Sequence, residues 1–280
     1  MKDMVAALSA ISRRAGDAIL EVYDREDFGI ETKDDDSPLT KADLASHDII
    51  VGALAEAFPD VPVLSEEDAD ISFEERGKWS RYFLVDPLDG TKEFISRNGE
   101  FTVNIALIEQ GVPVAGVVYV PVKRVLYGGL NGEDKFAFKV EGDVEREIKV
   151  RQLEERLQNG EPLTVVASRR HGGENLAKCL SVLDDAFGEV ESRNMGSSLK
   201  LCLVAEGEAD IYPRLAPTSE WDTAAAQAVV EAAGGKVVDV ALERLRYNTK
   251  PALLNPFFYV LGDPDFDWDS ILSRVDVTPV

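Results

Sequence analysis

An apolar run at residues 82–85 leads directly into the sequence Asp-Pro-Leu-Asp-Gly-Thr, residues 86–91. Aromatic and β-branched residues in such a run predict a buried strand. Proline has no N–H group and a fixed φ, so we expect the ladder to end at Asp86-Pro87. This segment, residues 81–86, is expected to be the central strand of a sheet.

The turn after this strand carries oxygen-bearing side chains on a flexible backbone. Asp86 and Asp89 lie three residues apart, Gly90 permits a close approach of the backbone, and Thr91 adds a hydroxyl. Mg²⁺ prefers oxygen ligands of this kind. Asp and Thr are also common turn and helix-cap residues, so these residues alone fit a capped turn equally well.

Composition limits the classes of partner. The 280 residues carry 52 acidic against 30 basic side chains, a net charge of −22, which disfavours nucleic acids and anionic lipid. An anionic substrate would therefore need local cations or a metal ion. Cys179 and Cys202 are predicted to be buried thiols rather than a disulfide. The absence of a membrane-span or signal-peptide pattern predicts a cytoplasmic protein.

Hydrophobic periodicity predicts helices at both ends of the chain and strands between them. In the first half we expect helices over residues 3–25 and 41–57, the second capped by Thr40 with Asp43, and strands over 61–64, 101–108 and 114–120. A polar stretch over 141–160 predicts a boundary between units 1–150 and 151–280. Beyond it, strands and helices alternate over residues 163–167, 174–185, 190–193, 197–206, 210–215, 221–233 and 236–240.

Four acidic side chains stand where predicted elements begin or end: Glu66, Asp86, Asp89 and Asp222. Glu66 alone fits a solvated loop, and Asp222 alone fits a helix N-terminal acid. Together they predict carboxylates converging on a Mg²⁺ pair, which can clamp both oxygens of a phosphoryl transfer. His171, in a basic stretch after a predicted strand, could face a phosphate. The chain contains no P-loop and no zinc-ligand pattern.

At this point a resemblance emerges. Residues 86–91 and the sequence Trp-Asp-Thr-Ala-Ala at 221–225 resemble the two-part signature of the inositol-monophosphatase superfamily. Lys92-Glu93 is similar to the variant found in its bacterial CysQ-type 3′(2′),5′-bisphosphate nucleotidases. The similarity extends over nearly the whole chain and weakens over 125–160 and after 240.

The resemblance implies the α/β sugar-phosphatase fold, an αβαβα sandwich, and Mg²⁺-dependent hydrolysis of adenosine 3′,5′-bisphosphate to AMP. The sulfated nucleotide 3′-phosphoadenylyl sulfate is an expected second substrate. Two or three Mg²⁺ ions are expected on Glu66, Asp86, the Leu88 carbonyl, Asp89 and Asp222. Asp43 and Thr91 resemble the pair that activates the attacking water. The expected substrate contacts are Glu66, Leu88, Asp89, Gly90, Thr91, Ser197, Lys200, Arg214 and Asp222.

We also expect a monomer or weak homodimer. The resemblance implies peripheral association at the inner face of the cell membrane. Two alternatives remain. One is a phosphatase for inositol phosphates or fructose 1,6-bisphosphate. The other is a non-catalytic, metal-binding regulatory protein of the same fold. Lys200 in particular also fits an exposed helix lysine.

Overall fold

The structure, a computed structural model, describes residues 1–25, 29–32, 38–168 and 173–277. Within them the large sheet has seven strands in the order β3-β4-β5-β6-β7-β8-β9. Strand β3 is parallel to β4, and every other neighbouring pair is antiparallel. The strands span Val63–Ser65, Arg81–Asp89, Thr102–Glu109, Val112–Val120, Val125–Leu130, Phe136–Glu141 and Val144–Glu147.

The small sheet has, among the described residues, five strands in the order β11-β10-β12-β14-β13. Strand β10 is parallel to β11 and to β12, whereas β14 is antiparallel to its two neighbours. In sheet order the strands span Val190–Met195, Leu163–Ser168, Ile211–Arg214, Phe258–Leu261 and Lys236–Asp239. A short antiparallel pair, β1 (Glu31–Thr32) with β2 (Pro38–Leu39), lies outside both sheets.

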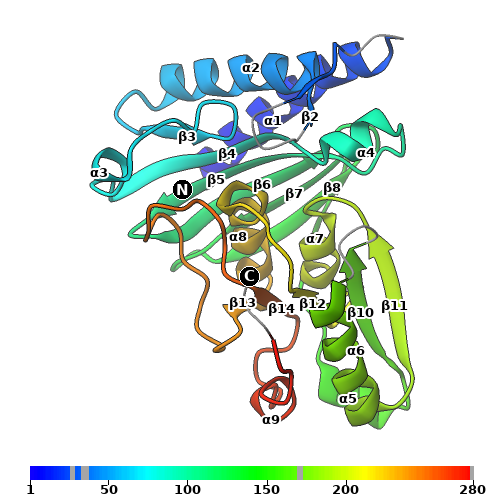
Figure 1. The fold of residues 1–280 in the computed structure, drawn as a ribbon. Helices are drawn as coiled ribbons and strands as arrows, with labels where there is room; N and C mark the ends of the chain where they lie inside the picture. The colour runs from blue at the N-terminus through cyan, green and yellow to red at the C-terminus, as the bar shows by residue number, and fades with distance from the viewer. Residues whose placement is uncertain (26–28, 33–37, 169–172, 278–280) are drawn as a thin grey trace.

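Helices cover both sheets in layers (Figure 1). Helices α1 and α2 pack on one face of the large sheet, and α8 packs on its other face. Helix α7 contacts the small sheet, whose far face packs against α6 and α9. The predicted αβαβα sandwich is therefore confirmed. The helices are α1 (Lys2–Tyr23), α2 (Lys41–Ala57), α3 (Phe73–Arg76), α4 (Thr91–Ile95), α5 (Leu153–Gln158), α6 (Gly173–Phe187), α7 (Leu199–Ala205), α8 (Ala224–Ala232) and α9 (Asp269–Leu272).

The structure confirms the helices predicted at the N-terminus. Helix α1 buries the apolar positions that recur at helical spacing, including Leu8, Ala15 and Ile19. Helix α2 begins after Thr40, whose side chain forms the predicted capping box with Asp43. Both helices pack on the same face of the large sheet, so they place Asp43 beside strand β4.

Two expectations about β4 are wrong. The strand lies second from the edge of the large sheet rather than at its centre. The short β3 pairs with it in parallel on one side, and the antiparallel strands β5 to β9 follow on the other side. The ladder also continues past Pro87 to Asp89, with a shift of register between Asp86 and Asp89. Pro87 donates no hydrogen bond to the ladder, and a β-bulge at this point allows pairing with β5 to resume at Asp89.

The second half of the chain contributes to the core of the first. Helix α8 lies against strands β5, β6 and β7, and Val229 and Val230 belong to the same hydrophobic cluster as Leu84 of β4. Gly116 and Gly129 allow this approach, since a Cβ at either would meet the α8 backbone within 3 Å. The division at residue 150 stays a prediction. Among the described helices, none is long and apolar enough to cross a membrane.

Candidate metal centre and substrate cavity

The bulge in β4 turns two aspartates to the same face of the large sheet. Asp86 pairs with Asn104 and Asp89 with Thr102, so Pro87 and Leu88 together oppose the single residue Val103. Residues three apart in a regular strand point to opposite faces, and one extra residue reverses that relation. Leu88 consequently joins the core under α1 and α2, while both carboxylates face the α8 side.

The bulge is held by hydrogen bonds from inside and outside the strand. The Leu88 N–H donates to Asp86 Oδ1 at 3.0 Å, and the buried Ser46 hydroxyl of α2 donates to the Pro87 carbonyl at 2.7 Å. These bonds satisfy groups that the interrupted ladder leaves without strand partners.

A third aspartate arrives from the other half of the chain. Asp222 ends a 3₁₀ turn, Glu220–Asp222 (η1), directly before α8. Its Oδ2 atom accepts from the Ser219 N–H at 2.9 Å and from the Thr218 hydroxyl at 2.5 Å. The predicted helix over 221–233 is therefore a 3₁₀ turn followed by α8, because Ser219 and Asp222 form a capping box of their own.

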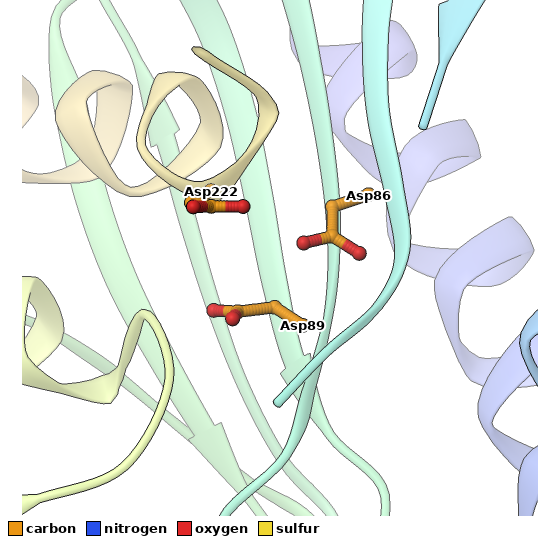
Figure 2. A group of neighbouring side chains, drawn as sticks. All are labelled: Asp86, Asp89 and Asp222. Atoms are coloured by element: carbon orange, nitrogen blue, oxygen red, sulfur yellow. The ribbon is translucent and has the colours of Figure 1, made fainter. Parts of the chain in front are cut away.

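The three carboxylates converge (Figure 2). One ligand oxygen from each of Asp86, Asp89 and Asp222 lies within 4.8 Å of the other two. Asp89 Oδ2 accepts hydrogen bonds from Ser198, as Asp222 Oδ2 does from its own turn. Within the described residues, the second oxygen of Asp89 and of Asp222 accepts no hydrogen bond. These oxygens remain able to bind a cation.

Charge repulsion accompanies this convergence. Burial raises the pKa of Asp86 well above its usual value, and the charges of Glu66, Asp89 and Asp222 raise it further. Burial and the charge of Asp89 raise the pKa of Asp222 to about 6. A divalent cation would relieve this repulsion, and the donor set of carboxylate oxygens fits a hard ion such as Mg²⁺. We call Glu66, Asp86, Asp89 and Asp222 the carboxylate cluster.

Asp43 and Thr91 meet next to this cluster, as the sequence predicts. The Thr91 hydroxyl lies 3.2 Å from Asp43 Oδ1 and 3.5 Å from the Leu88 carbonyl. Asp43 is 1% exposed, and its Oδ2 accepts from the backbone and the hydroxyl of Thr40 at 2.8 and 2.6 Å. Gly90 lies between the carboxylate cluster and helix α4, and the chain turns there. Its φ of +90° is a backbone conformation that favours glycine.

A cavity of about 530 Å³ opens beside the cluster. Of the predicted substrate contacts, Leu88 is absent from its lining, because its side chain is buried in the core under α1 and α2. All the other predicted contacts line it: Glu66, Asp89, Gly90, Thr91, Ser197, Lys200, Arg214 and Asp222.

Two buried cations, Lys200 and Arg214, share this cavity, and we call them the basic pair. Lys200 is 6% exposed, so the alternative of an exposed helix lysine is wrong. Its Nζ donates to the carbonyls of Ser197 at 2.6 Å and Met195 at 3.3 Å, and burial lowers its pKa to about 8. Arg214 Nη2 donates to the Pro217 carbonyl at 2.7 Å. Its buried Nε has no hydrogen-bond partner among the described residues.

Sequence reasoning selected Ser197 and missed its neighbour Ser198. The Ser197 hydroxyl lies 2.9 Å from the Asp89 carbonyl and 2.7 Å from the Glu100 carbonyl, whereas Ser198 contacts the Asp89 carboxylate itself. Ser197 has a φ of +47°, which turns the two side chains apart. The feature of the sequence that could have indicated Ser198 as a site residue is its position directly after Ser197. His171 lies outside the described residues.

Comparison with known proteins decides the family. The model described as "Inositol monophosphatase family" matches residues 1–259. The chain belongs to the inositol monophosphatase family. This membership confirms the resemblance stated from residues 86–91 and 221–225.

Within the inositol monophosphatase family, the chain is similar to bacterial CysQ proteins. It is 50% identical over 258 residues to the 3′(2′),5′-bisphosphate nucleotidase CysQ of Salmonella typhimurium and 48% identical to that of Escherichia coli, covering 92% of this chain and 99% of each relative. The crystal structure of CysQ from Bacteroides thetaiotaomicron superimposes with a TM-score of 0.77 at 43% identity. That match covers 93% of this chain and 98% of the other.

Proposed function

We propose that this chain is a Mg²⁺-dependent 3′(2′),5′-bisphosphate nucleotidase that hydrolyses the 3′-phosphate of adenosine 3′,5′-bisphosphate to give AMP. 3′-Phosphoadenylyl sulfate is the proposed second substrate. One observation carries the proposal: a single cavity is lined both by three carboxylates, Glu66, Asp89 and Asp222, and by a pair of buried cations. A substrate with two phosphates can use both. Identity of about 50% to the named CysQ nucleotidases supports the same activity.

Glu66, Asp86, Asp89, Asp222 and the Leu88 carbonyl are the proposed ligands of two or three Mg²⁺ ions. When bound, Mg²⁺ supplies Lewis-acid polarisation of the phosphate and favours the ionised form of water. The residues contribute fixed positions for the oxygen donors. The β4 bulge orients Asp86 and Asp89, and the η1 turn orients Asp222.

Asp43 and Thr91 are the proposed groups that activate the attacking water. With its proton directed to Asp43 at 3.2 Å, the Thr91 oxygen keeps lone pairs that can accept a hydrogen bond from water. Asp43 can then take up a proton through Thr91 as general base. The Thr40 donors hold Asp43 in place.

The backbone N–H groups of Gly90 and Thr91 are proposed to bind the phosphate that is cleaved. Ser197, Lys200 and Arg214 are proposed to hold the other phosphate. The buried, unpartnered Nε of Arg214 favours this assignment, because a buried donor gains most from an anionic acceptor. In a protein of charge −22, such local cations are what lets a bisphosphate approach.

A phosphate-release assay over a substrate panel tests the proposal. Adenosine 3′,5′-bisphosphate, 3′-phosphoadenylyl sulfate, inositol 1-phosphate and fructose 1,6-bisphosphate are compared at equal enzyme, with Mg²⁺ and with chelator. We expect the highest kcat/KM for adenosine 3′,5′-bisphosphate and no turnover with chelator. Preference for inositol 1-phosphate or fructose 1,6-bisphosphate would replace the nucleotidase assignment. Mg²⁺ binding without any phosphate release would indicate a non-catalytic regulatory protein.

Further expectations concern the state of the protein in the cell. We infer a cytoplasmic monomer or weak homodimer, with peripheral contact to the inner face of the membrane. Light scattering at two protein concentrations measures the first, and sedimentation with anionic vesicles measures the second. The net charge of −22 repels an anionic surface, so we expect weak vesicle binding at low salt that does not decrease with added salt.

A further inference from the structure

Ser198 lies where three separate parts of the fold meet. It directly precedes helix α7, is 2% exposed, and contacts the β4 bulge, strand β5 and the η1 turn. The sequence distance between these partners is large: Asn104 and Asp89 come from the first half, and Asp222 from the second.

The hydroxyl oxygen of Ser198 accepts one hydrogen bond, and its single proton has two possible acceptors. The Asn104 Nδ2 group donates to the Ser198 oxygen at 2.9 Å. The hydroxyl carries a single proton, so it then donates either to Asp89 Oδ2 at 2.8 Å or to the Asp222 carbonyl at 2.6 Å. Its backbone N–H donates to the same Asp89 Oδ2 at 2.6 Å.

These contacts orient the Asp89 carboxylate. Oδ2 accepts the Ser198 N–H, the Ser198 hydroxyl can donate to it or to the Asp222 carbonyl, and Thr102 and Asn104 approach it at 3.4 and 3.5 Å. Rotating the carboxylate would give up these bonds, and hydrogen bonds to a charged group are the strong ones. Oδ1 accepts no hydrogen bond from the described residues and is therefore the Asp89 oxygen left for a cation.

We propose that Ser198, with Asn104 behind it, is a positioning residue that sets the spacing of Asp89 and Asp222 for metal binding. The inference rests on the proposed metal-dependent function. Ser198 links the carboxylate of Asp89, which accepts its backbone N–H, to the backbone of Asp222, which can accept its hydroxyl, and these two residues belong to different halves of the chain. Its loss would widen the carboxylate cluster without removing any ligand.

The test measures Mg²⁺ affinity by calorimetry and by thermal shift, independently of turnover. We expect Ser198→Ala to raise the Mg²⁺ dissociation constant by about 10-fold, as for other lost partners of metal ligands. The Mg²⁺ concentration for half-maximal rate should rise in parallel, while kcat at saturating Mg²⁺ changes by less than about 3-fold. The matched control is Ser12→Ala. Ser12 is a buried serine of α1 whose hydroxyl donates to the Ser9 carbonyl of the same helix, and α1 lies on the opposite face of the large sheet from the carboxylate cluster. Ser12→Ala should leave Mg²⁺ affinity unchanged.

The outcomes separate this inference from the proposed function. Failure of the wild-type chain to bind Mg²⁺ would overturn both. If wild type and Ser198→Ala bind Mg²⁺ with equal affinity, the positioning role alone is overturned. The same conclusion holds if Ser198→Ala has a lower melting temperature in chelator but an unchanged affinity for Mg²⁺. Should Ser198→Ala not melt cooperatively, Asn104→Ala removes the donor that directs the hydroxyl. We expect at least about 3-fold weaker Mg²⁺ binding there, and unchanged affinity would overturn the inference.

Discussion

The basic pair and three members of the carboxylate cluster, Glu66, Asp89 and Asp222, line one cavity, but the two groups use their hydrogen bonds differently. Asp89 and Asp222 each bind protein donors through one oxygen and leave the other uncommitted. Lys200 instead directs its ammonium group to two backbone carbonyls, whereas the Arg214 Nε has no hydrogen-bond partner in the part of the chain that the structure describes. The cluster is thus preorganised for a cation. Of the basic pair, Arg214 is the member that stands ready for an anion, while Lys200 contributes mainly its charge.

Removing a charge from the carboxylate cluster should have the largest effect. We expect Asp89→Asn to lower kcat with adenosine 3′,5′-bisphosphate by about 10³-fold or more, the scale of a lost electrostatic stabiliser of the transition state. The melting temperature in chelator should stay equal or rise, because repulsion with Asp86 and Asp222 decreases. Asp263→Asn, a buried aspartate that bonds the Leu153 N–H, is the control for a lost buried charge. Near wild-type turnover in Asp89→Asn would remove Asp89 from the metal site.

The Asp43–Thr91 pair should affect chemistry without affecting metal binding. We expect Thr91→Ala to lower kcat by ~10²-fold, the lower range for a general-base contribution, with the Mg²⁺-dependent rise in melting temperature preserved. Thr164→Ala is the matched control, since that threonine is buried and its hydroxyl has no partner among the described residues. An equal loss of Mg²⁺ stabilisation would mean that Thr91 serves the cluster rather than the water.

The basic pair should determine specificity. Arg214→Ala should lower kcat/KM for adenosine 3′,5′-bisphosphate by roughly 10- to 100-fold, the scale of one lost charge-assisted hydrogen bond. A substrate with one phosphate should be nearly unaffected. Because Arg214 is 9% exposed, the loss should depend little on salt. Arg193→Ala, at a partly exposed arginine that forms ion pairs with Glu191 and Glu208, is the control. An equal loss on both substrates would assign Arg214 to the fold or the metal site.

The smallest effect concerns pH. Since the folded-state pKa of Asp222 is raised from 3.8 to about 6, the metal-free fold loses stability as pH rises across that range. Mg²⁺ binds the ionised carboxylates, so its stabilisation should grow over the same range. We expect Mg²⁺ to raise the melting temperature more at pH 7.5 than at pH 5. Each kcal/mol of additional stabilisation by Mg²⁺ should add about 2–4 °C to the rise. Asp222→Asn should reduce this difference, and a rise that is equal at both pH values would contradict the cluster's role.

Local patterns in the sequence predicted much of this fold. The periodicity of residues 3–25, the capping box at Thr40 and the apolar run before Asp86 each depend on neighbours a few residues away. The convergence of Asp222 with Asp86 and Asp89 was predicted from their positions at the ends of predicted elements and was supported by the family resemblance, and the structure brings all three together.

Features that depend on distant pairing were not predicted. The bulge at Pro87 exists because β4 pairs with β5 on both sides of it, which no local rule for proline contains. The role of Ser198 depends on the positive φ of Ser197 and on partners 94 and 109 residues away. Helix α8 reads as a helix in the sequence, but its packing on the large sheet appears only in three dimensions.

Product identity tests most directly whether the two groups act on different phosphates. Adenosine 3′,5′-bisphosphate is incubated with the enzyme and Mg²⁺, and the nucleotide product is identified by chromatography against 5′-AMP and 3′-AMP. If the carboxylate cluster cleaves the 3′-phosphate while the basic pair holds the other, 5′-AMP accumulates as the sole nucleotide product. Accumulation of 3′-AMP, or rapid conversion to adenosine, would show that the basic pair does not select which phosphate is retained.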